Sequence, residues 1–176
     1  DGNVYAQTYG DGGPYTFSVE QSSSRYDIRW NFPPISNSSA VYYLSYTVHG
    51  GLRFYDDGDQ IWWKAIYGDR SFPVLDGTVK VAVPSPSVIE EYAAYINDGD
   101  ARDSATAVVA DDQRSIVYDL TKTLQAGQDF EVRVQFTEGV VDGAHADHPV
   151  VICTVSSSAA RMRQIDRTSA GAAMKT

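Results

Sequence analysis

Residues 42–69 hold the densest group of side chains that could do chemistry, because aromatic and acidic residues share this short stretch. The candidates for ligand binding in it are His49, Asp56, Asp57, Asp59, Trp62 and Trp63. A histidine near carboxylates suits a His–Asp pair or a metal site. An exposed tryptophan could stack on a sugar ring. The same residues also suit the core of a plain β-hairpin.

The hairpin interpretation explains most of this stretch. An acidic turn around Gly58 separates two runs of alternating residues, and the second run carries Trp62 and Trp63. Adjacent side chains in a strand point to opposite faces, so one of these rings is expected in the core. The other ring is free to cover a sheet edge or to bind a ligand, and it is the candidate for glycan binding.

A second acidic loop follows residue 96. Asp98, Asp100 and Asp103 lie close together in "NDGDARD" and supply the oxygen atoms that Ca²⁺ prefers. Acidic loops of an acidic protein are commonly only solvated. The sequence therefore predicts no cofactor, with Ca²⁺ at this loop as the alternative.

Catalytic motifs give little support for an enzyme. The sequence has no G-x-S-x-G, H-E-x-x-H or phosphate-binding loop. His49 has acidic residues nearby in the chain, but no nucleophile is identifiable beside it. The residues favour a non-catalytic domain, and a metal-binding or hydrolytic domain around an acidic loop is the alternative.

Total charge limits the partners. The chain has 176 residues and a formal net charge of −9, which disfavours binding to nucleic acid and to anionic lipid headgroups. No run of eighteen apolar residues occurs in it. An unknown protein or a glycan is therefore the expected partner.

Alternation with a period of two dominates the pattern of hydrophobic residues and predicts an all-β fold. In "RYDIRWNF" and "FEVRVQF" each apolar residue is followed by a polar one. Turn residues recur at intervals typical of antiparallel β-sandwiches. We expect an antiparallel β-sandwich that is immunoglobulin-like in the broad sense.

One segment breaks this alternation. Residues 88–96 follow a Ser-x-x-Glu pattern and carry apolar residues at helical spacing, which predicts a short helix, with an additional strand as the alternative. A single β-sandwich domain is expected over residues 1–155. Residues 156–176 are rich in Ser, Ala and Gly and are expected to form a flexible linker or tail.

Several landmarks occur in a fixed order in "YYLSYTVHGGLRFYDDGDQIWW", "DGTVKVAVPSPS" and "LQAGQDFEVRVQFTEGVV". The chain here resembles the extracytoplasmic part of the YciQ-like predicted membrane proteins, a domain of unknown function (family 2207). The positions that carry the resemblance are Tyr46, Val48, Gly50, Asp56, Asp59, Trp63, Pro84, Leu124, Gly127 and Gly139.

This resemblance implies a location and no reaction. Members of the family continue into transmembrane helices, so the domain is expected at the cell envelope, outside the cytoplasmic membrane of a bacterium. Its link to the membrane would be a transmembrane segment absent from this chain. The family domain usually begins with a further hairpin, which we expect this chain to lack. The expected function is interaction or sensing without catalysis.

Overall fold

The structure of the protein is a computed structural model that describes residues 2–22, 25–34, 41, 43–139, 149–150, 155–156 and 169–175. Contacts between residues divide the chain into two compact units. One comprises residues 1–40 and 161–176, and the other comprises residues 41–160. All regular structure in the described residues is β-strand, so the expected all-β class is confirmed.

The first unit contains one four-stranded sheet in the order β1-β2-β3-β15. Its strands are β1 (Ala6–Gln7), β2 (Thr16–Ser22), β3 (Arg25–Asn31) and β15 (Ser169–Lys175). Strand β1 pairs with β2 in parallel, and the other pairs are antiparallel. Residues 169–175 lie in the segment expected as a flexible linker or tail, and they pair with β3 along its whole length. The division into a domain over 1–155 and a tail over 156–176 stays a prediction. Most of the remaining tail lies outside the described residues.

The second unit contains a five-stranded, a four-stranded and a two-stranded sheet, and we call the first two its larger sheets. The five-stranded sheet has the order β5-β6-β12-β8-β9, and its neighbouring strands are antiparallel. Its strands are β5 (Leu52–Arg53), β6 (Asp59–Ile66), β12 (Phe130–Phe136), β8 (Ile89–Ile96) and β9 (Gly99–Asp100). The four-stranded sheet has the order β10-β11-β7-β14. Its strands are β10 (Ala105–Val109), β11 (Ser115–Leu120), β7 (Thr78–Ala82) and β14 (Val155–Ser156).

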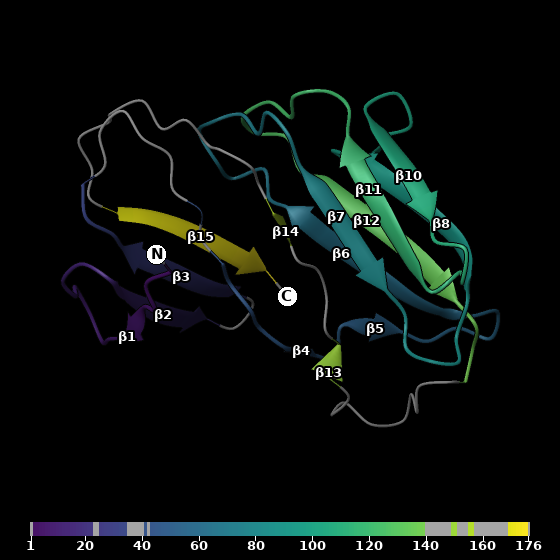
Figure 1. Cartoon of the computed structure of the whole chain (residues 1–176), viewed down its shortest axis with the longest axis horizontal. Helices are drawn as coiled ribbons and strands as arrows, with labels where there is room; N and C mark the ends of the chain where they lie inside the picture. Colours follow the sequence, from purple (N-terminus) through teal and green to yellow (C-terminus); the bar gives the residue numbers. More distant parts are fainter. Residues whose placement is uncertain are drawn as a thin grey trace. The chain divides into compact units, whose positions relative to one another are not determined.

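A third, two-stranded sheet joins β4 (Val48–His49) to β13 (Pro149–Val150). The two larger sheets lie one over the other, as Figure 1 shows for β7, β10 and β11 across β6, β8 and β12. The hydroxyl of Tyr118 in β11 donates a hydrogen bond of 3.0 Å to the carbonyl oxygen of Arg133 in β12. This contact joins the sheets directly. The arrangement is compatible with the expected sandwich, while its immunoglobulin-like topology stays a prediction.

Alternating burial shows where the core lies. The apolar residues of β12 are fully buried, and so are Ile116 and Tyr118 of β11. The buried residues of β12 are Phe130, Val132, Val134 and Phe136. Polar residues between them, such as Glu131 and Arg133, point to the outer face of the five-stranded sheet. The core therefore lies between the two larger sheets.

The expected helix near 88–96 is wrong: these residues form strand β8. Ser87 is the serine of the Ser-x-x-Glu pattern that was expected to cap this helix. Its hydroxyl has no hydrogen-bond partner among the described residues, and its amide donates a hydrogen bond to the carbonyl oxygen of Pro84. Strand β8 instead pairs with β12 from Ile89 to Ile96. Pairing with a distant strand has overridden the local helical pattern, as tertiary context often does.

Candidate functional site

The two neighbouring tryptophans of β6 lie on opposite faces of the five-stranded sheet. Trp63 is 8% exposed and lies in the core opposite Val132. Trp62 is half-buried on the outer face, opposite Arg133. Strand geometry thus leaves Trp62 as the ring that a ligand can reach.

Trp62 belongs to a row of stacked side chains on this outer face, which we call the aromatic row: Arg53, Trp62 and Tyr95. The guanidinium carbon of Arg53 lies 4.6 Å from the centre of the Trp62 ring. The rings of Trp62 and Tyr95 are stacked, with their centres 6.0 Å apart and their planes at 16°. Because β12 lies between β6 and β8, the two rings must meet over β12. The aromatic row therefore spans four neighbouring strands.

Ion pairs border the aromatic row. Arg133 of β12 donates a hydrogen bond of 2.9 Å to Glu91 of β8. Lys64 of β6 pairs with Asp129, and this hydrogen bond raises the pKa of the lysine. The outer face thus combines aromatic surface with charges of both signs, a composition that suits recognition of another molecule.

The sequence alone did not indicate Arg53 and Tyr95. Tyr95 lies in the segment for which a helix was predicted, and a helix would separate it from Trp62. Only the register between β8 and β12 places Tyr95 beside the tryptophan. Had 89–96 been read as a strand, the alternation of Glu91, Ala93 and Tyr95 would have been the signal.

The acidic turn before β6 divides its carboxylates between two environments. Asp56 and Asp57 are exposed, whereas Asp59 is only 3% exposed. Burial raises the pKa of Asp59, the charge of Glu138 raises it further, and a hydrogen bond from the amide of Gly139 opposes both effects. Its Oδ2 atom has no hydrogen-bond partner in the described part of the chain. The charged form of Asp59 is therefore disfavoured by its surroundings, while Asp56 and Asp57 are exposed surface groups.

His49 lies in β4, and the side chain itself is outside the described residues. The expected pairing of His49 with the acidic turn, and the hydrolytic site built on that pairing, therefore stay predictions.

The loop at 98–103 is organised by an arginine. Asp100 accepts hydrogen bonds from the Nε and Nη2 atoms of Arg102, at 3.0 and 2.6 Å, and from its amide at 2.8 Å. These bonds lower the pKa of Asp100. Among the residues that the structure describes, no three His, Cys, Asp or Glu side chains converge as a metal site would require. Ca²⁺ at this loop stays a prediction.

A protein-family model described as "Predicted membrane protein (DUF2207) N-terminal domain" matches residues 2–136. The chain belongs to this family. Neither the curated proteins nor the solved structures contain a significant match. The function of the DUF2207 domain is unknown, and its description as part of a membrane protein implies association with a membrane.

Several landmark positions of this DUF2207 chain lie at turns. Gly50, Gly127 and Gly139 all adopt positive φ angles, which glycine accepts without strain. Pro84 precedes the turn that leads into β8, and its carbonyl accepts the amide of Ser87. Tyr46 lies half-buried before β4. These landmarks shape the backbone of the domain.

Arg70 holds the turn that contains Gly127. Its guanidinium donates hydrogen bonds to the carbonyl oxygens of Tyr67 (2.7 Å), Gln125 (2.8 Å), Gln128 and, more weakly, Leu124. Burial lowers the pKa of Arg70. In the described residues this half-buried arginine donates its hydrogen bonds to backbone carbonyls, which is a structural role, so we place it outside the candidate site.

No helix among the described residues is long and apolar enough to cross a membrane. The candidate functional site of this DUF2207 domain is the outer face of the five-stranded sheet, with the aromatic row at its centre.

Proposed function

We propose that this DUF2207 domain is a non-catalytic interaction or sensing domain, and that it recognises its partner with the outer face of the five-stranded sheet. The observation that carries the proposal is the aromatic row. Tryptophan, tyrosine and arginine are the residue types most often enriched at the centres of recognition sites. Here they are arranged side by side on a rigid sheet, bordered by the ion pair of Arg133 and Glu91.

The proposed location is the extracytoplasmic side of a bacterial cell membrane. It is supported by the family's description as a predicted membrane protein. A reporter that is active only outside the cytoplasm, fused after Thr176 within the membrane protein, tests it. The proposal expects activity of this reporter, and activity of a cytoplasm-specific reporter at the same position would contradict it.

Photo-crosslinking tests the proposed surface in cells. A photoreactive amino acid at Tyr95, on the outer face of the five-stranded sheet, is expected to form adducts with an envelope component. The matched control is Val108, which is 63% exposed on β10 of the other large sheet. Adducts from position 108 at the same yield, or none from position 95, would contradict the proposed surface.

A glycan-binding module is the second candidate, and the half-buried ring of Trp62 favours it. Carbohydrate binding uses the open face of a rigid aromatic ring. Arg53 and Tyr95 already contact Trp62, so a sugar would have to bind across the row or displace one of them. Because of this competition we place a protein partner at the envelope ahead of a glycan. Adducts that resist protease but not glycosidase treatment would reverse that order.

A further inference from the structure

The buried carboxylate of Asp59 has an incomplete set of partners. The residue is 3% exposed, and the amide of Gly139 donates a hydrogen bond to its carboxylate. The Oδ2 atom is buried without any hydrogen-bond partner in the described residues. A buried acceptor of this kind costs free energy unless a proton, a water molecule or a cation satisfies it.

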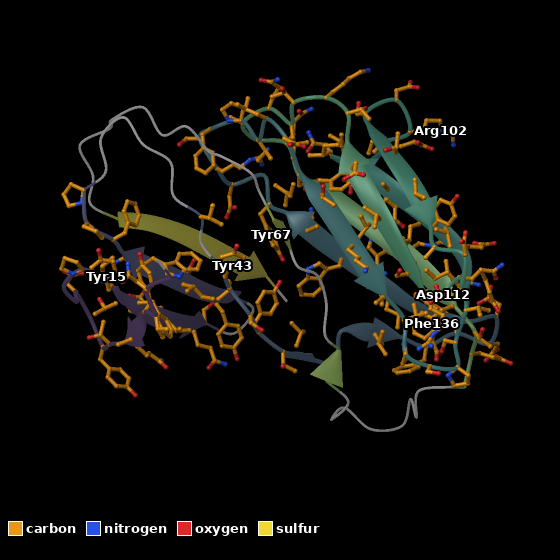
Figure 2. The ribbon with its side chains drawn as sticks, in the orientation of Figure 1. Tyr15, Tyr43, Tyr67, Arg102, Asp112 and Phe136 are labelled. Carbon is orange, nitrogen blue, oxygen red and sulfur yellow. The ribbon has the colours of Figure 1, made fainter. Side chains whose placement is uncertain are left out.

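Glu138 brings a second carboxylate to the same end of the sheet. Asp59 pairs with Phe136, the last residue of β12, and Glu138 follows two residues later. Because the amide of Gly139, the next residue, donates a hydrogen bond to Asp59, Glu138 lies beside this carboxylate, and its negative charge raises the pKa of Asp59. Glu138 itself is exposed, so the pair is formed by one buried and one accessible carboxylate. Figure 2 places Phe136 at the opposite end of the strands from Arg102, so this pair is remote from the 98–103 loop.

The turn that carries Asp59 is held in place by neutral groups. The side-chain amide of Gln135 donates a hydrogen bond of 2.8 Å to the backbone carbonyl oxygen of Asp57. The side-chain amide of Gln60 donates one of 2.8 Å to the side-chain oxygen of Gln135. At Gly58 a Cβ atom would lie 2.9 Å from the Gln135 side chain, so the backbone approaches β12 as closely as it can. These contacts hold the backbone on both sides of Asp59 against β12.

We propose that Asp59 and Glu138 bind a hard divalent cation, Ca²⁺ or Mg²⁺, at the end of β6 and β12. A cation would satisfy the free oxygen of Asp59 and neutralise the repulsion between the two acids at once. Two carboxylates supply only part of the six or more oxygen ligands, so water molecules would complete the coordination. Such open sites bind weakly, with dissociation constants on the order of 10⁻⁴ to 10⁻³ M. The inference is independent of the proposed recognition surface.

Terbium luminescence and thermal unfolding of the 176-residue chain test the proposal. Trp63 lies four residues from Asp59 on the same face of β6, roughly 13 Å away at the usual rise of a strand, close enough to sensitise bound Tb³⁺. We expect terbium emission that Ca²⁺ or Mg²⁺ displaces, and the more effective ion identifies the preferred cation. Tm is expected to rise by roughly 5 °C at a tenfold excess of the cation over its dissociation constant.

Variants identify the site. Asp59→Asn is expected to abolish both responses, and Glu138→Gln to weaken cation binding about tenfold. Asp56→Asn is the matched control, because Asp56 is an exposed acid of the same turn, and it should respond like the wild type. KCl at equal ionic strength separates binding from charge screening. If Asp59→Asn fails to fold, Glu138→Gln still tests the site, because Glu138 is exposed and its replacement should leave the fold intact.

Three outcomes would overturn the proposal. The first is a wild-type Tm that does not change at 10 mM of either cation, which is about ten times the largest dissociation constant expected. The second is an equal shift of Tm in KCl. The third is a Glu138→Gln variant that responds to the cation like the wild type.

Discussion

At the scale of single residues, some side chains of this domain stabilise the fold and others lower its stability. Asp59 is the clearest example of the second kind, since burial and Glu138 both disfavour its charged form. The sequence showed an acidic turn but could not rank its members. Which carboxylate is buried depends on the register between β6 and β12, and these strands are separated by more than sixty residues of chain.

Replacement of Asp59 is expected to change the pH dependence of stability. The folded-state pKa of Asp59 lies above its ordinary value of 3.8. The carboxyl group therefore stabilises the fold most below pH 3.8, and this contribution is lost as the pH rises through the folded-state pKa. In cation-free buffer, Asp59→Asn should therefore gain stability relative to the wild type as the pH rises from below 3.8 through the folded-state pKa of Asp59. Urea unfolding at several pH values measures this difference, and a constant difference would contradict the assignment.

Arg70 is expected to be the most sensitive charged residue. Arg70→Ala leaves several carbonyl oxygens of the 124–128 turn without their donor, and should cost about 2–4 kcal/mol of unfolding free energy. Arg102→Ala is the matched control, because its ion pair with Asp100 is exposed and should change Tm little. Chemical denaturation of both variants checks this prediction. Equal losses would show that the contacts of Arg70 with the carbonyl groups carry no special weight.

At the scale of elements, local alternation predicted strands well where one face is buried. Residues 59–66 and the "FEVRVQF" segment form β6 and β12 as expected. The segment at 89–96 is a strand that local alternation did not predict. Its residues suit a helix by spacing, and only the partner strand β12 makes the extended form the better solution. The aromatic row was missed for the same reason, since its members come together through pairing between distant strands.

Gly68 lies where the chain after β6 approaches the 124–128 turn closely. A Cβ atom at this position would lie 2.7 Å from the carbonyl oxygen of Gly127, closer than a real Cβ contact allows. Gly68→Ala should therefore lower stability by about 1–3 kcal/mol by displacing the 124–128 turn. Gly13→Ala is the control, because no atom lies within 4 Å of its Cβ position. Thermal unfolding compares the two, and equal Tm values would contradict the close approach.

At the scale of the whole molecule, composition limited the classes of partner that the domain could bind. A net charge of −9 disfavoured binding to nucleic acid. The order of landmarks indicated the DUF2207 family, and the match of the family model to residues 2–136 confirms it. The sequence could not locate the candidate surface, because a surface is formed by strands that are far apart in the chain. The division into two compact units was likewise not expected, since the alternation of strands looks the same in both.

We propose that the outer face of the five-stranded sheet recognises a component of the cell envelope. Fluorine NMR of the chain labelled with 5-fluorotryptophan tests it directly, because the protein has three tryptophans in different environments: Trp30, Trp62 and Trp63. On addition of solubilised envelope material, we expect the Trp62 resonance to shift or broaden and that of buried Trp63 to stay unchanged. A Trp62 resonance that does not respond to material that perturbs either of the others would contradict it.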